Sequence, residues 1–223
     1  VILKDEVSEL AAQMLWAELV PEDGSGGGSG GVTPGRVVAA DEVRFAGAEG
    51  LVATCDRMEA DARVQKVELF AEDAGGAVMI GRGGTYVSGR RVELDGIART
   101  ARVVGDGFFS HDGEIDGRPT TAAARWRDGL YLDDASGLVH VSGAAEAVSS
   151  ADVWTRDTMS ADWVELRLTP GGSGDEECGP RVLLGVRAGR SGGAGSQRVK
   201  VESRRYEMPV EMAAGSAEEE VGG

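Results

Sequence analysis

The sequence predicts an all-β fold of antiparallel strands built from repeated hairpins, and three observations support this. Apolar and polar residues alternate over short segments, as where Val164, Leu166 and Leu168 oppose Glu165 and Arg167. This alternation is typical of a strand with one buried face. Glycine and aspartate clusters separate such segments about every 8 to 12 residues, as in a sandwich or roll. The 35 glycines are roughly twice the usual share and indicate many turns.

One motif recurs along the chain and indicates a repeat. It has a small residue, then a charged residue, and two positions later an apolar residue followed by glutamate. The copies are LVATCDRMEAD at 51–61, YVSGRRVELDG at 86–96, TMSADWVELRLTP at 158–170 and VKVESRRYEMP at 199–209. The charged positions, such as Asp56 and Arg90, are separated by about two strands and their turns. The repeating unit is therefore predicted to be a hairpin.

Loop composition divides the chain into six expected regions. Glycine-rich segments, each following a matching strand and proline, predict loops. Because the chain begins with Val1, we expect an excised piece or mature product, slightly longer than one repeat period. The expected regions are the end of a preceding repeat (1–20), a glycine-rich loop (21–35), one β-roll (36–170), glycine-rich loops with a strand (171–197), the start of the next repeat (198–210) and an acidic flexible tail (211–223).

The segment 8–19 has two interpretations. Ser8 would cap a helix in which Leu10, Met14 and Leu15 form an apolar stripe. However, the end of the segment aligns with the strand at 161–170, and a repeat should keep its secondary structure. Strand is favoured and helix remains the alternative.

Charge and cysteine content restrict the possible partners. A formal charge of −15 argues against nucleic acid and anionic membrane surfaces, because both would be repelled. No run of about 18 apolar residues is present, so no membrane span is predicted. Two cysteines are too few for a disulfide framework. Cys55 is expected to be a small buried hydrophobe, and its pairing with Cys178 is left open.

No arrangement of residues predicts catalysis, a metal site or a cofactor. The segment HDGEIDG at 111–117 resembles the start of a calcium loop, but the closing glutamate would fall at Ala123. We expect a hairpin tip there. His111 and His140 have no cysteine or second histidine at metal-ligand spacing. The chain is therefore expected not to be an enzyme.

The tryptophans and the apolar face have structural and functional interpretations. Trp126, Trp154 and Trp163 are expected in the core or at its rim rather than as a sugar platform. Near-identical hairpins with one aliphatic face can form an open roll, and an aromatic content of only 5% leaves room inside for alkyl chains. A solid core is the alternative. The residues expected to line the interior are Val43, Phe45, Met58, Val92, Leu94, Val164 and Leu166.

The motifs LVATCDRMEAD…VQKVELF…GAVMIG and GLVHVSGAAEAVSSADVWTRDTMSADWVELRLTP resemble the OstA-like family of periplasmic lipopolysaccharide-transport domains. The resemblance covers about residues 36 to 170. It implies a β-jelly roll or β-taco with open sheet edges, whose interior shields the acyl chains of lipopolysaccharide or a similar lipid. It also implies a non-enzymatic role in the periplasm and end-to-end strand pairing with related domains. The alternative is a structural or adhesive β-repeat envelope protein with a closed core.

Overall fold

A single antiparallel sheet of fifteen strands forms almost all of the structure and confirms the all-β prediction. The computed structural model describes residues 1–4, 6–21, 32–73, 75–82, 84–115, 118–152, 155–168, 183–189 and 200–205. The strands are β1 (Ile2–Lys4), β2 (Glu9–Ala11), β3 (Met14–Pro21), β4 (Val32–Ala46), β5 (Val52–Asp61), β6 (Lys66–Phe70), β7 (Val78–Arg82), β8 (Thr85–Asp95), β9 (Thr100–Ile115), β10 (Arg118–Trp126), β11 (Gly129–Asp133), β12 (Leu138–Asp152), β13 (Thr155–Leu168), β14 (Leu183–Gly189) and β15 (Lys200–Arg205).

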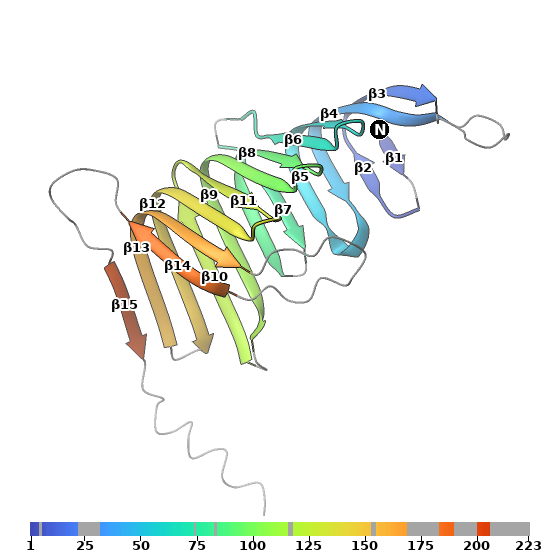
Figure 1. Ribbon diagram of the computed structural model, residues 1–223. Coiled ribbons are helices and arrows are strands. Elements are labelled where there is room, and N and C mark those ends of the chain that lie inside the picture. Colours follow the sequence, from blue (N-terminus) through green and yellow to red (C-terminus); the bar gives the residue numbers. More distant parts are fainter. Residues whose placement is uncertain are drawn as a thin grey trace, which may run out of the picture.

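The sheet is folded lengthwise into two layers, which we call wing A and wing B (Figure 1). Six long strands, β4, β5, β8, β9, β12 and β13, run through both wings. The short strands β3, β6, β11 and β14 pair only with the long strands in wing A. The short strands β1, β2, β7, β10 and β15 belong to wing B. The chain therefore runs as a meander of bent strands.

Each long strand passes between the wings at a corner where the strand pairing skips residues. Two residues on one strand lie opposite one on its partner: Asp41 and Glu42 opposite Asp56, Gly105 and Asp106 opposite Arg90, and Gly143 and Ala144 opposite Asp162. These are β-bulges, which bend a strand. The charged residue of the recurring motif is thus the corner residue.

The two-residue corners have left-handed backbone conformations. The φ angles are 61° at Asp41, 55° at Glu42, 81° at Gly105, 84° at Gly143 and 50° at Ala144. Glycine adopts such angles without strain, and aspartate tolerates them better than most residues. Glycine or aspartate occupies three of these five positions, and Glu42 and Ala144 adopt the same conformation at a higher steric cost.

Small residues next to the corners allow the two wings to meet. A Cβ atom on Gly89, in wing B, would lie 2.1 Å from Cγ1 of Val103, in wing A. Cys55 and Ala161 occupy the same motif position and are 7% and 4% exposed. The corner reverses the usual alternation of inward and outward side chains. The small residue before the charged corner residue and the apolar residue two positions after it therefore both point inward. The motif therefore describes a tight corner between two layers.

Continuous cross-strand rows form the core. In wing A, the inward-facing row next to the corners is apolar across nine strands. Eight pairs of directly opposite residues connect its members. Its members are Ala39, Met58, Leu69, Val92, Val103, Leu130, Val141, Val164 and Ala188. Most of them belong to the buried cluster. This row, together with buried residues of wing B beside the corners such as Val43 and Val78, forms the floor between the wings.

The segment 8–19 forms β2 and β3, so the helical alternative is wrong. Leu10 and Leu15 both pack in the core, on the two sides of a corner at Ala12 and Gln13. The backbone N–H of Gln13 donates a hydrogen bond to the carbonyl oxygen of Asp41, 2.9 Å away. This bond joins the segment to the first two-residue corner and gives it the bent-strand form of the repeat.

Several expected boundaries shift or fall outside the described residues. The loop expected at 21–35 is shorter, because β3 includes Pro21 and β4 begins at Val32. The strands β14 and β15 lie inside the regions expected to contain them, 171–197 and 198–210. The expected tail at 211–223, Trp154 and Cys178 lie outside the part that the structure describes.

We predict that side chains added next to the corner destabilise the protein. Gly89→Ala would push Cβ against Val103, and Gly107→Ala would place Cβ 2.4 Å from the Trp126 ring. Overpacking of this kind costs about 1–3 kcal/mol, measurable as a lower midpoint in urea unfolding. Gly75→Ala is the matched control, because nothing lies within 4 Å of the added carbon. Equal stability of all three variants would show that the wings do not meet here.

Candidate functional site

The candidate site is the space between the wings, which is lined by apolar side chains. Among the described residues, no polar or charged side chain is buried. Residues half-buried on both inner faces pack against the buried cluster, including Val67 and Leu94 in wing A and Ile80 and Phe109 in wing B. The interior therefore has a packed floor at the corners and apolar walls that are partly accessible to solvent.

All seven residues expected to line the interior lie on the inner faces, but at two depths. Four are in the floor: Val43, Met58, Val92 and Val164 are 2%, 6%, 2% and 4% exposed. Phe45, Leu94 and Leu166 are half-buried and belong to the walls. The wall side chains are partly accessible to solvent, whereas those of the floor are not. Contact of these side chains with a lipid remains a prediction.

The strand pairing identifies further wall residues that the sequence motif did not predict. Leu94 pairs with Val67 on β6, and Leu166 pairs with Val139 on β12. In wing B, Phe109 pairs with Val87 and Met159 pairs with Ala147. Four of these residues lie outside the copies of the recurring motif, although alternation with polar neighbours signals a half-buried strand; they are Val67, Phe109, Val139 and Ala147.

An apolar recess opens at the edge of wing A. It encloses about 440 Å³ and its walls are almost entirely apolar. Val37, Ala60 and Val67 line it from three neighbouring strands, and the turn residues Ala62 and Gln65 border it. The recess continues the wall of the candidate site toward the rim of the sheet. It is large enough for several methylene groups.

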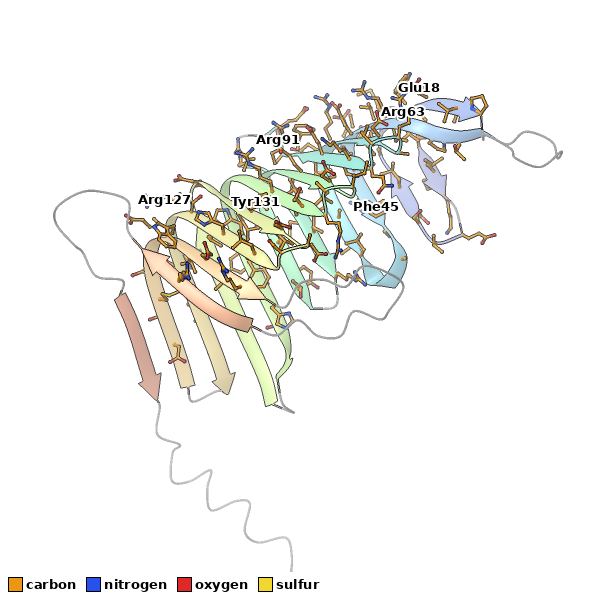
Figure 2. All side chains as sticks on the ribbon, in the orientation of Figure 1. Glu18, Phe45, Arg63, Arg91, Arg127 and Tyr131 are labelled. Atoms are coloured by element: carbon orange, nitrogen blue, oxygen red, sulfur yellow. The ribbon has the colours of Figure 1, made fainter. Side chains whose placement is uncertain are left out.

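The outer face of wing A is charged, in contrast to the inner face. Alternate residues such as Glu59, Glu68 and Glu93 face outward in one cross-strand row. Figure 2 shows Glu18, Arg63, Arg91 and Tyr131 along the outer side of this wing. Strict alternation thus places the apolar and charged residues of one strand on opposite faces.

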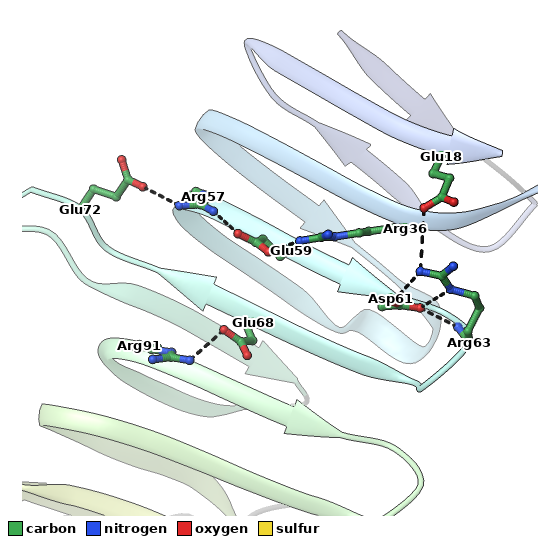
Figure 3. A network of polar contacts seen from close by, with 9 residues as sticks. All are labelled: Glu18, Arg36, Arg57, Glu59, Asp61, Arg63, Glu68, Glu72 and Arg91. Atoms are coloured by element: carbon green, nitrogen blue, oxygen red, sulfur yellow. Dashed lines mark hydrogen bonds and ion pairs between the residues drawn. The ribbon is translucent and has the colours of Figure 1, made fainter.

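Ion pairs connect these outer residues across strands (Figure 3). Arg36 donates a 3.0 Å hydrogen bond to Glu59, which also pairs with Arg57. The Arg36 contact lowers the pKa of the Glu59 carboxyl below its usual value, assisted by Arg57. The stabilisation is therefore present above the carboxyl's unfolded-state pKa and is lost as the pH falls through the lower folded-state pKa. Because the arginine side chains of these pairs are 48% and 41% exposed, solvent screens the interaction and the contribution of each pair is small.

The corner residue Asp56 has a structural role. Its Oδ2 accepts hydrogen bonds from the backbone N–H groups of Glu72 at 2.7 Å and Asp73 at 3.3 Å. These bonds fix the connection between β6 and β7 at the corner of β5. The arrangement satisfies two backbone donors.

The described residues contain no group of three or more histidine, cysteine, aspartate or glutamate side chains that could hold a metal ion. Nδ1 of His111 lies 2.8 Å from Oγ1 of Thr85. His140 stacks with Trp163, with ring centroids 6.0 Å apart. Trp126 is 3% exposed and belongs to the core. No helix in the described part of the chain is long and apolar enough to cross a membrane.

The comparisons with known proteins do not assign the chain to a family. The sequence matches no family model, and no curated protein matches it significantly.

We predict that the Cys55 thiol is unreactive in the folded protein. Burial raises its pKa from 9.0 to about 11, so little thiolate forms at pH 8.5. In a Cys178→Ser background, iodoacetamide should modify Cys55 far more slowly in buffer than in urea. The raised pKa also implies stability that is full below about pH 9 and falls as the pH rises toward 11. Equal alkylation rates in the two conditions would contradict this burial.

Proposed function

We propose that this chain is a non-enzymatic lipid-carrying segment, which holds acyl chains of lipopolysaccharide or a similar lipid between its two wings. The main support is one observation. The inner walls are apolar along the sheet, yet Phe45, Leu94 and Leu166 are only partly buried. A closed sandwich would bury such side chains between its sheets. Apolar walls left open to solvent favour an apolar ligand.

The dimensions of the site suit extended chains. Wing A contains ten paired strands, from β3 to β14. With about 4.8 Å between strands, the apolar wall is roughly 40 Å long. Each methylene group moved from water into this space would contribute about 0.8 kcal/mol. Because no polar side chain is buried among the described residues, specificity for a headgroup would have to come from the rims.

The resemblance to OstA-like domains supports lipopolysaccharide as the lipid and the periplasm as the compartment. The motif that carries the resemblance coincides with the corners, such as Cys55–Asp56 and Ala161–Asp162. In this chain the corners create the bent sheet between whose wings the acyl chains would lie. Lipid class and compartment are the parts of the proposal that depend on the resemblance.

Open sheet edges support end-to-end pairing with related domains. Each wing ends in strands that pair on one side only among the described strands: β1 and β3 at one end, β14 and β15 at the other. Apolar side chains are exposed at the first end, where Ile2 is 65% and Trp16 55% exposed. Unpaired edges of this kind template the addition of another strand. Pairing would extend the apolar walls into a neighbouring domain.

The alternative is a structural or adhesive β-repeat protein of the envelope, with no ligand. The packed floor favours it, because Val43 and Val92 are each only 2% exposed. The floor alone would stabilise the fold, so the walls would then serve only packing or assembly. Lipid capture at the walls distinguishes the two functions.

We predict that a photo-reactive residue on the wall captures lipid and that its neighbour does not. p-Benzoylphenylalanine at position 94 or 166 should crosslink to purified lipopolysaccharide on irradiation. At position 93 or 165 it should not, because Glu93 and Glu165 lie on the outer face. The two positions of each pair are adjacent in one strand, so the crosslinkers differ mainly in the face of the sheet from which they project. Crosslinked lipid is measured by mass spectrometry.

The other outcomes have clear meanings. Capture at both positions of a pair would indicate non-specific surface binding. Capture at neither position, in variants that unfold cooperatively, would favour the structural alternative.

We predict concentration-dependent self-association through the edge strands. High salt should strengthen it, because screening reduces repulsion between chains of charge −15. Trp16→Lys, on edge strand β3, should weaken association in sedimentation velocity by placing a charge at the edge. Met79→Lys is the control, since Met79 is 49% exposed but lies on the interior strand β7. A monomer at millimolar protein and high salt would exclude pairing of this chain with itself.

A further inference from the structure

The outer row of wing A beside the corners differs between its two halves. In the first half, Phe70 pairs with Arg57 on β5 and with Arg91 on β8. Both guanidinium groups lie over the Phe70 ring, with Cζ 5.3 Å and 5.2 Å from its centroid. Such cation–π contacts are favourable when the cation lies within about 6 Å of the ring centroid. The row is therefore filled by an aromatic ring between two cations.

In the second half the same row contains small residues. Cross-strand pairing continues from Val104 to Gly129, Ser142, Trp163 and Gly189. Gly129 and Ser142 replace the long side chains of the first half, and a recess of about 440 Å³ lies beside them. We call it the Trp163 recess. Its lining residues are Asp128, His140, Ser142, Gly143, Ala144, Asp162, Trp163 and Glu165.

The indole of Trp163 is held in place by its neighbours. It covers Gly189, the residue opposite it on β14, where an added Cβ would lie 2.5 Å from indole Cζ2. His140 stacks nearly parallel to it, with an interplanar angle of 20°. The ring is thus positioned across β13 and β14 as a wall of the recess. An ordered aromatic ring binds a partner at low entropic cost.

Apart from His140, the titratable side chains that line the recess itself are all carboxylates. Three carboxylates, Asp128, Asp162 and Glu165, line it together with Trp163, and no lysine or arginine does. Glu165 also pairs with Arg167, 3.3 Å away. The chain as a whole carries −15, so its long-range field attracts cations and repels anions.

A second hollow extends the recess along the outer face. It encloses about 190 Å³ and shares Asp128, His140 and Ser142 with the first. Tyr131, which Figure 2 shows on the outer side of the wing, also lines it, as does Arg102 at the end away from Trp163. The two hollows together cross β9, β11, β12 and β13, a length suited to an extended peptide.

We propose that the Trp163 recess binds an arginine side chain from an extended segment of a partner protein. The guanidinium group stacks on Trp163 as Arg57 and Arg91 stack on Phe70, and Asp128 and Glu165 supply the counter-charge. The site lies on the opposite face of wing A from the proposed lipid walls. It is therefore independent of what the inner faces bind.

The test uses the full chain and two short peptides. The probe is acetyl-Gly-Gly-Arg-Gly-Gly-amide, and its control contains citrulline, which has the same shape as arginine but no charge. The indole N–H signal of Trp163 should shift on titration with the arginine peptide in ¹H–¹⁵N NMR. The citrulline peptide should bind at least about fivefold more weakly. Raising the salt to 0.5 M should weaken arginine binding, because screening reduces the attraction.

Variants separate the ring from the charges. Asp128→Asn with Glu165→Gln keeps the shape and should weaken binding by about fivefold or more. Trp163→Leu should lose about two- to fivefold in affinity, and Trp163→Phe should recover part of it. Trp16→Leu, which removes a 55% exposed tryptophan on β3, should leave binding unchanged. Because Trp163 supports β14, the carboxylate variant decides the matter if Trp163→Leu unfolds.

Three results would overturn the proposal. Equal binding of the citrulline and arginine peptides would show that charge is not recognised. Unchanged affinity in the carboxylate variant would exclude the recess as the binding site. A Trp163 shift with an oligosaccharide but not with the arginine peptide would assign the site to sugars.

Discussion

The corner between the two wings is the constraint on which the rest of the structure depends. The backbones can approach there only where one wing has almost no side chain, as where Val103 occupies the place of a Cβ on Gly89. A bulge of two residues opposite one then turns both strands together. Because the turn reverses alternation, apolar residues on both sides of the corner face inward. Repetition of this unit produces a bent sheet whose inner face is apolar in both wings and whose outer face is charged in wing A.

Distance from the corner also separates the residues that stabilise the fold from those that could contact a ligand. The floor residues beside it are packed and buried, so the fold does not need a ligand to exclude water from them. The walls farther from the corner are equally apolar but only partly buried. A ligand placed there would add burial without disturbing the floor. This division is the physical basis of the proposed lipid function, and it also explains how the same fold could exist without lipid.

Local alternation was sufficient to predict the strands and the inward side of each one. In neighbouring residues such as Met58 and Glu59, or Leu94 and Asp95, the apolar side chain faces inward and the charged one outward. Side-chain chemistry alone therefore indicates the face. The repeat also showed which residues are equivalent, and the segment 8–19 follows the repeat in forming strands. The meaning of the motif could not be derived in this way, because it depends on contact between wings. Gly89 and Val103 are separated in sequence, and only their packing explains the small residue.

Features that span several strands were beyond sequence reasoning for the same reason. The Trp163 recess requires the register that aligns Gly129 with Ser142 and Ser142 with Trp163. Each of these residues alone is unremarkable for an outward strand position. Trp163 was expected at the core or its rim, and the structure places it on the outer face of wing A, over Gly189. Register, rather than composition, creates the site.

The central claim is that lipid occupies the space between the walls, and methionine oxidation tests it most directly in the unmodified protein. Met159 lies half-buried on the inner wall of wing B, Met58 lies in the floor at 6% exposure, and Met79 is 49% exposed on an outer face. The measurement is the rate of oxidation of each by hydrogen peroxide, with and without lipopolysaccharide. The account predicts that lipid protects Met159, leaves Met79 reactive and leaves Met58 slow throughout. Oxidation of Met159 at an unchanged rate in saturating lipid, or equal protection of Met159 and Met79, would contradict it.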